Sequence, residues 1–282
     1  MLQAVVCYLS ALIIYVDRNK MKKSLQILFS ILLLTLISAC ATNLAGRTQV
    51  MLVSEDKAIE ASKEAYIATM EDFKQKGQLD KDPGMVKRVN EITTKLIRQA
   101  KILRPSSSDW EWSVKVIDEP ETINAWCMAG GRMAIYSGLI NKLSATDDEI
   151  AQVMGHEISH ALANHTAERM SVAMASGLAV DLYNSTVGES TGTTSLASAA
   201  AQVALTLPNS RTGESEADKI GIELAAKAGY NPNAAVTLWQ KMAAAGGGSS
   251  LEFLSTHPAP ENREKALKKL IPQMMPYYQA AK

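Results

Sequence analysis

Two histidines and a glutamate stand close together in the pattern His156-Glu157-Ile158-Ser159-His160. On an α-helix, residues four apart lie on the same face with Cβ atoms about 5–6 Å apart, so both imidazoles can bind one metal ion. Glu157 lies about 100° further round the helix, where its carboxylate can act on a water molecule but is not placed as a third ligand. The pattern therefore predicts a zinc peptidase site with Glu157 as the general base. A surface helix that carries two histidines by chance is the weaker alternative.

A catalytic zinc ion takes three protein ligands and keeps one position open, so a third ligand must come from elsewhere in the chain. A helix predicted over residues 211–228 carries several carboxylates. Glu216 shares a face with lysines three and more residues away, which predicts a solvated face. Glu214 and Asp218 lie on the other side with small residues that allow close packing. Glu214 is therefore the predicted ligand, and Asp218 the predicted partner that orients a ligating histidine.

Different roles are predicted for the two remaining histidines, His165 and His257. His165 is placed about 180° from His156 on a continuous helix, so it is not expected to bind the same metal. Three uses are open for His257, on a later loop. It can stabilise the oxyanion, a use for which Arg211 is the alternative residue, it can act as a fourth ligand that keeps the enzyme latent, or it can cap the last helix.

The secondary structure around these residues is predicted to be α+β and mainly helical. The motif helix begins at a capping box from Thr146 to Glu149, with its apolar residues opposite the histidines, so a core behind and a cleft in front are expected. Other predicted elements are two amphipathic helices, a strand, a Gly-Gly hairpin and an Ala/Ser-rich segment that is either a movable lid or, as favoured, a plain helical hairpin. They cover residues 54–76, 86–97, 110–117, 124–136 and 171–208.

The amino terminus is typical of a bacterial lipoprotein signal. Residues 21–40 contain two lysines, an apolar run and small residues before Cys40, which is the predicted lipidation site. The apolar run is short for an uncleaved membrane helix, the alternative reading. Residues 1–20 are interpreted as a possible misassigned extension, because Met21 can serve as the start. Residues 41–50 are predicted to be a tether, and residues 51–275 a metallopeptidase domain.

The composition excludes some other classes. Lysine plus arginine and aspartate plus glutamate both number 29, so no basic field indicates a nucleic-acid partner. The three cysteines allow no disulfide framework and no Cys-x-x-Cys zinc knuckle. Cys127, among apolar residues, is expected to be a buried thiol.

Longer motifs surround the ligand candidates. Ser210-Arg211-x-x-Glu214-x-Glu216-Ala217-Asp218-x-x-Gly221 follows the histidine motif, and Ser255-Thr256-His257-Pro258 precedes Asn262-Arg263. With His156-Glu157-x-x-His160, these resemble the metallopeptidase family of the CAAX prenyl protease, the heat-shock protease HtpX and mitochondrial Oma, over about residues 52–272. The resemblance implies a gluzincin-type domain with a small β-sheet flanking the active-site helix and one Zn²⁺ per subunit. It also implies Glu214 as the zinc ligand, and it allows a proton-donating role for Asp218.

The predicted function is a zinc-dependent endopeptidase that cleaves unfolded or misassembled cell-envelope proteins. The chain looks like the lipid-anchored periplasmic branch of the family, and Ala41 after the cysteine points by resemblance to the outer membrane, facing the periplasm. Outer-membrane assembly machinery is then a possible partner. The alternative is a zinc-stabilised periplasmic chaperone or assembly factor with latent or no proteolysis.

Overall fold

The computed structural model describes residues 40–187, 196–245, 252–258 and 262–282. The chain divides into two units, Met1–Ala41 and Thr42–Lys282. Only Cys40 and Ala41 of the first unit are described, so the predicted extension and nearly all of the predicted signal lie outside the described residues. Within the ranges that the structure describes, no helix combines the length and the apolarity needed to span a bilayer.

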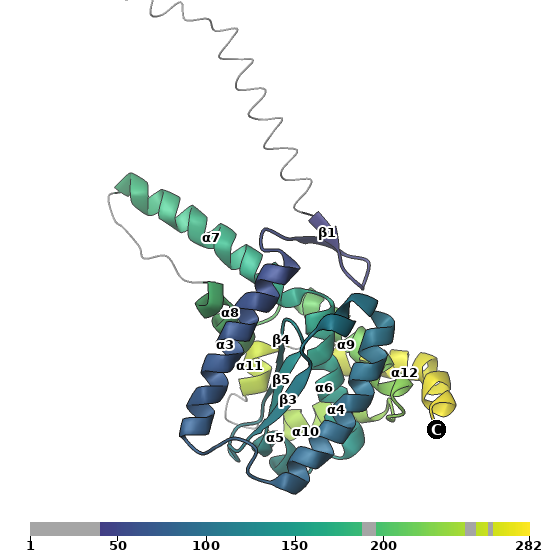
Figure 1. Cartoon of the computed structure of the whole chain (residues 1–282). Coiled ribbons are helices and arrows are strands. Elements are labelled where there is room, and N and C mark those ends of the chain that lie inside the picture. Colours follow the sequence, from purple (N-terminus) through teal and green to yellow (C-terminus); the bar gives the residue numbers. More distant parts are fainter. Residues whose placement is uncertain (1–39, 188–195, 246–251, 259–261) are drawn as a thin grey trace, which may run out of the picture. The chain divides into compact units, whose positions relative to one another are not determined.

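The described elements are mostly helices, with a few short strands (Figure 1). In chain order they are β1 (Cys40–Thr42), β2 (Thr48–Val50), α3 (Glu55–Gln75), α4 (Pro83–Leu103), the 3-10 helix η1 (Pro105–Asp109), β3 (Ser113–Ile117), β4 (Ala125–Met128), β5 (Arg132–Tyr136), α5 (Ser137–Lys142), α6 (Asp147–Leu162), α7 (His165–Val187), α8 (Leu196–Leu205), α9 (Arg211–Lys227), α10 (Ala234–Ala245), α11 (Glu252–Thr256) and α12 (Arg263–Ala280). The predicted fold class, α+β and mainly helical, is confirmed.

The helices begin where the sequence provides capping side chains. Ser54 accepts a hydrogen bond from the backbone at the start of α3, and Asp82 does the same for α4, where Pro83 stands in the first turn. At the start of α6 both halves of the capping box are present, because Thr146 and Glu149 each accept from the backbone N–H of the other. These local signals explain why the predicted helix starts agree with the structure.

The predicted hairpin forms part of a three-stranded sheet. β4 pairs antiparallel with β5, and β3 pairs parallel with β5, so the strand order is β3-β5-β4 (Figure 1). Gly130 and Gly131 connect β4 to β5 with φ angles of 85° and 84°, which favour glycine. A Cβ atom on Gly131 would lie 2.5 Å from the Trp112 ring, so this turn also needs the missing side chain for space.

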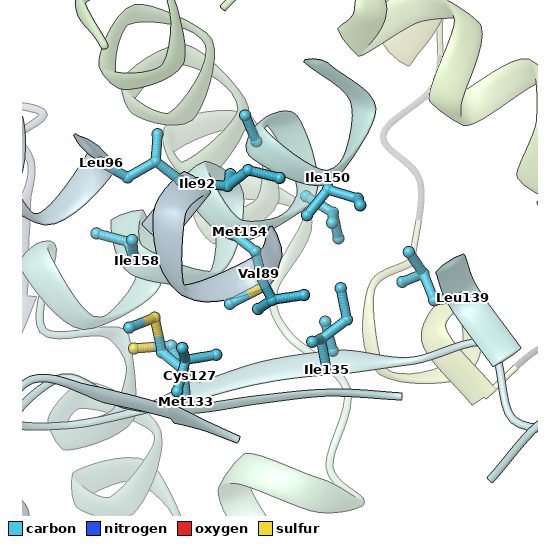
Figure 2. Close-up of a cluster of buried hydrophobic side chains, with 14 of the residues drawn as sticks. Val89, Ile92, Leu96, Cys127, Met133, Ile135, Leu139, Ile150, Met154 and Ile158 are labelled. Atoms are coloured by element: carbon cyan, nitrogen blue, oxygen red, sulfur yellow. The ribbon is translucent and has the colours of Figure 1, made fainter. Parts of the chain in front are cut away.

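The largest hydrophobic cluster holds α6 between α4 and the sheet. Val89 and Ile92 of α4 pack with Met154 and Ile158 of α6, and Met133 of β5 lies on the sheet side (Figure 2). Every residue of α6 from Glu149 to Leu162 is buried. The expected opposition of an apolar face and an open histidine face is therefore wrong: α6 is enclosed on all sides, because α9 and α10 cover the face that carries the motif.

Helices α6 and α9 approach closely at two glycines. A Cβ atom on Gly221 would lie 2.8 Å from the backbone nitrogen of His156, and one on Gly155 would lie 3.0 Å from the carbonyl oxygen of Gly221. Neither backbone can move apart without opening the core. The absence of these side chains lets the carboxylates of α9 reach the histidines of α6.

Residues 42–53, here called the N-terminal arm, pack against α7 and α9. Arg47 forms ion pairs with Glu168 and Glu216, and the buried side chain of Gln49 donates to the carbonyl oxygen of Ala163. The backbone N–H of Val53 donates to the Ser171 hydroxyl. The described part of the predicted tether is therefore attached to the domain, since buried polar contacts hold it in place.

The segment between the two ligand-bearing helices contains α7 and α8. The two helices predicted there are confirmed, although α7 is longer than expected and begins at His165. Part of the predicted link, residues 188–195, lies outside the described residues. The distal part of α7 extends away from the helices around the sheet (Figure 1).

Candidate metal centre

The three predicted metal ligands come together from two helices. His156 and His160 project from α6, with their Nε2 atoms 3.1 Å apart. Glu214, from the first turn of α9, places Oε2 3.4 Å from His156 Nε2 and Oε1 3.3 Å from His160 Nε2. All three side chains are buried, and that of Glu214 is completely inaccessible. The α6–α9 crossing is what brings these atoms to one point.

This donor set fits a zinc ion. Zinc prefers imidazole and carboxylate donors at about 2.0–2.2 Å in tetrahedral sites, and the edges of such a tetrahedron are about 3.3–3.6 Å long. The two Nε2 atoms are 3.1 Å apart, and each has one oxygen of Glu214 at 3.3 or 3.4 Å, so the spacing of the donors is close to that edge length. Oε2 of Glu214 is also buried without a hydrogen-bond partner among the described residues. A buried carboxylate oxygen with no donor hydrogen bond is what a cation ligand requires.

His257 is the fourth member of the group. Its Nδ1 lies 3.0 Å from Glu214 Oε1 and 3.4 Å from His156 Nε2, and the ligand atoms of all four residues lie within 4.8 Å of one another. Its ring stacks on Phe253, with centroids 4.3 Å apart. The predicted capping use is wrong, because α12 begins after its own N-cap residue, Asn262.

Glu157 lies next to the donor group but outside it. Its side chain is buried, and Oε1 has no hydrogen-bond partner among the described residues. Nε2 of His257 lies 3.5 Å from Oε1 of Glu157. Burial raises the pKa of Glu157, against the opposing charges of His257 and His156. A carboxyl whose pKa is shifted toward neutrality is suited to accept and return a proton.

Asp218 and Arg263 support His156 from behind. Oδ1 of Asp218 lies 3.1 Å from His156 Nδ1 and accepts a 2.5 Å hydrogen bond from Arg263. This places Asp218 on the ring nitrogen opposite the donor group, which fits the orienting use predicted for it. Burial lowers the pKa of His156, but Glu214 and Asp218 outweigh burial and raise it to about 9. The His156 ring is therefore protonated on both nitrogens at neutral pH, unless a bound cation displaces the proton on Nε2.

The arginine at this site is Arg263, which the sequence analysis did not select. Its Nη1 lies 3.2 Å from Glu214 Oε2, and its guanidinium lies 3.4 Å from the centroid of the Trp239 ring. Arg211, the arginine that was selected, is exposed on the first turn of α9. The sequence signal for Arg263 was its place in the Asn262-Arg263 pair of the carboxy-terminal motif, since no helical periodicity links it to the histidines.

His165 and Glu216, which lie behind His160, are placed differently from the sequence prediction. α6 ends at Leu162, and Asn164 has a left-handed φ of 58°, so His165 does not lie on a continuation of α6. Its Nδ1 lies 2.7 Å from Nδ1 of His160, although it is outside the donor group as predicted. Glu216 is buried and bonded to His165 at 2.9 Å. The prediction of a solvated Glu216 was wrong, because the N-terminal arm covers that face of α9.

Comparison with known proteins agrees with this geometry. The profile of peptidase family M48 matches residues 85–271, which is more than half of the chain. Mitochondrial metalloendopeptidase OMA1 of Bos taurus is 33% identical over 242 residues, covering 82% of this chain and 45% of the relative. Metalloprotease YcaL of Escherichia coli is 27% identical over 248 residues, covering 85% of this chain and 96% of the relative.

A third relative is the β-barrel assembly-enhancing protease of Escherichia coli, 30% identical over 210 residues, with 69% of this chain and 40% of the relative covered. The chain spans less than half the length of the mitochondrial relatives from Arabidopsis thaliana, Bos taurus and Schizosaccharomyces pombe that it matches. The profile match covers the motif helix, α9 and the loop with His257, the elements that carry the donor group. The chain belongs to peptidase family M48, a family of zinc metallopeptidases.

Proposed function

We propose that this protein is a zinc-dependent endopeptidase that cleaves unfolded or misassembled proteins of the cell envelope. The observation that carries the proposal is the buried group of His156, His160 and Glu214, with the unpaired carboxylate oxygen of Glu157 beside it. Three ligands and an adjacent base are the components that hydrolysis of a peptide bond requires.

In the proposed reaction, His156, His160 and Glu214 hold the zinc ion. Zinc supplies Lewis-acid chemistry, polarising the scissile carbonyl and making a water molecule more acidic. Glu157 takes a proton from the attacking water as the new C–O bond forms, and it delivers that proton to the amine nitrogen as the C–N bond breaks. Asp218 accepts the Nδ1–H of His156 and fixes the orientation of that ring.

Strand β4 is the proposed docking edge for an extended substrate. In the described sheet β5 is central, so of the two hairpin strands only β4 lies at an edge. It also lies near the base: burial raises the pKa of the Cys127 thiol on β4, and so does the charge of Glu157. Main-chain pairing with an edge strand selects extended backbone rather than a particular sequence.

An apolar cavity near the donor group supports a preference for unfolded chains. It has a volume of about 430 Å³ and is lined by side chains that include Val172, Leu207 and Asn209. Asn209 lies 3.1 Å from Nδ1 of His257, so the cavity adjoins the donor group. Unfolded proteins expose the apolar side chains that such a cavity can take up, whereas folded proteins bury them.

The proposed location in the cell envelope is inferred from the amino-acid sequence. The predicted lipoprotein signal ending at Cys40 supports a lipid anchor in the outer membrane, with the domain facing the periplasm. Similarity to a relative named for β-barrel assembly supports outer-membrane proteins as substrates and their assembly machinery as a partner. The chaperone alternative keeps the same location but requires no hydrolysis.

The proposal is tested by incubating the zinc-loaded protein with casein, which is largely unfolded, and with a compact folded protein of similar size. Cleavage of casein alone, abolished by a zinc chelator and restored by zinc, is the expected result. Mass spectrometry of the fragments would place the cuts within the chain rather than at its ends. No cleavage of either protein, with stoichiometric zinc bound, would contradict the proposed activity.

His257 is proposed to act as a latch, a fourth donor that fills the position needed by the substrate. Replacing His257 with alanine is therefore expected to raise the initial rate of casein cleavage several-fold, with zinc content unchanged. Phe253→Leu, which removes the stacking partner but keeps an apolar side chain, should raise the rate less. A rate lowered tenfold or more by His257→Ala would instead assign this residue to oxyanion stabilisation.

A further inference from the structure

Each of the two histidines on α6 has its second ring nitrogen bonded within the protein. Nδ1 of His156 contacts Asp218 directly, at 3.1 Å. Nδ1 of His160 instead contacts Nδ1 of His165, at 2.7 Å, and Nε2 of His165 contacts Glu216, at 2.9 Å. Both routes therefore end at a carboxylate of α9, one directly and the other through an additional imidazole.

An arginine stands behind each carboxylate. Arg263, from α12, donates to Asp218. Arg47, from the N-terminal arm, donates from Nε to Oε1 of Glu216 at 2.6 Å and binds both oxygens of Glu168 at 2.6 and 2.7 Å. Asn43 of the same arm donates to Oε2 of Glu216 at 2.7 Å. The second carboxylate is thus held by a segment outside the helices that carry the donor group.

In the hydrogen-bonded chain from His160 through His165 to Glu216, the metal at one end and the carboxylate at the other determine which ring nitrogen carries each proton. A metal on Nε2 of His160 requires the ring proton on Nδ1, which donates to Nδ1 of His165. His165 then carries its own proton on Nε2, which donates to Glu216. The carboxylate of Glu216 has to face His165 for this arrangement, and the donors from Arg47 and Asn43 fix its orientation. His165 and Glu216 are buried, so water does not compete for these bonds.

We propose that the N-terminal arm is a positioning element of the metal centre, in which Arg47 acts through Glu216 and His165 on the ligand His160. The inference rests on the proposed zinc site and goes beyond it, because it makes metal affinity depend on a segment immediately after the predicted lipidation site. Arg47 bonds Glu216 and Glu168, neither of which belongs to the donor group. It is a positioning residue, and its loss changes how firmly His160 holds the metal.

The test is zinc affinity of the full chain, measured by competition with a chromophoric chelator. Arg47→Ala is expected to weaken zinc binding about tenfold, at the lower end of the range of about 10–100-fold for outer-shell partners. Arg47→Lys, which keeps a charge near Glu216, should recover part of the loss. Arg88→Ala is the matched control: Arg88 donates to Asp147 and to the carbonyl oxygen of Ala145 at the start of α6, and its bonds do not involve His160, His165 or Glu216. It should leave zinc affinity unchanged.

Two further measurements separate positioning from general destabilisation. The visible d–d absorption of the Co²⁺-substituted protein should change in Arg47→Ala and not in Arg88→Ala, because it reports ligand geometry. In a His165→Phe background, Arg47→Ala should cause no additional loss of zinc affinity, since the route is already broken.

An equal loss with and without His165, or an unchanged affinity and Co²⁺ spectrum in Arg47→Ala, would overturn the inference while leaving the proposed function intact. Normal zinc binding by the wild-type protein without any peptidase activity would remove the proposed function and leave this test valid. A wild-type protein that binds no zinc would overturn both.

Discussion

Replacing Glu157 with glutamine is expected to lower the rate of casein cleavage about 10³-fold, which corresponds to about 4 kcal/mol of lost transition-state stabilisation. The amide has the same shape as the carboxyl but cannot take a proton from water. Because Glu157 lies outside the group of ligand atoms, zinc content should remain one per chain. Initial rates and elemental analysis of the same preparation check both parts of the prediction.

The same variant separates the two proposed functions in cells. If hydrolysis is the function, Glu157→Gln should fail to complement a strain that lacks the protein, although the variant folds and binds zinc. Full complementation would favour the chaperone alternative. A residual rate within tenfold of wild type would exclude Glu157 as the general base.

Replacing Glu214 with alanine is expected to weaken zinc binding by more than about 100-fold, beyond the range for outer-shell partners, and to abolish peptidase activity. Glu214 supplies the only carboxylate in the donor group and bonds both histidines of α6. Removal also leaves a methyl group where a charge was held between imidazoles and Arg263. Zinc affinity and content are the measurements.

Glu223→Ala is the matched control, because Glu223 lies on the same helix and pairs with Lys227 away from the histidines. This variant should bind zinc normally. Near-normal affinity in Glu214→Ala would show that the third ligand is another group, and the assignment of α9 as the ligand helix would then be wrong.

The elements that position the site could be predicted because their signals are local. The capping box at Thr146 and the Gly-Gly turn each need only neighbouring residues, and both are present in the structure. Helical spacing placed Glu214 and Asp218 together on the side of α9 that faces the histidines, and both contact His156 in the structure. The ligand geometry follows from the four-residue spacing of the histidines on α6 and from the close crossing of α6 and α9.

What could not be predicted depends on segments distant in sequence. The helix predicted over residues 54–76 is amphipathic as expected, but its Ile67 is 56% exposed, and α3 packs partly through small residues such as Ala58 and Ala65. Glu216 was assigned to solvent because its neighbours on α9 are lysines. The N-terminal arm, more than 160 residues earlier, covers it with Arg47.

His165 and Arg263 illustrate the same limit. A continuous helix would carry His165 away from His160, but α6 ends before the left-handed residue Asn164, and the His165 ring lies against that of His160. Arg263 reaches Asp218 across 45 residues, from a helix whose packing no periodicity specifies. Long-range contacts of this kind require the structure.

The most direct test of the metal centre is a crystal structure of the zinc-soaked protein, with anomalous diffraction recorded on both sides of the zinc absorption edge. A single peak is predicted, about 2.0–2.2 Å from His156 Nε2, His160 Nε2 and one oxygen of Glu214. A peak bound elsewhere, or no peak at these three side chains at saturating zinc, would contradict the account.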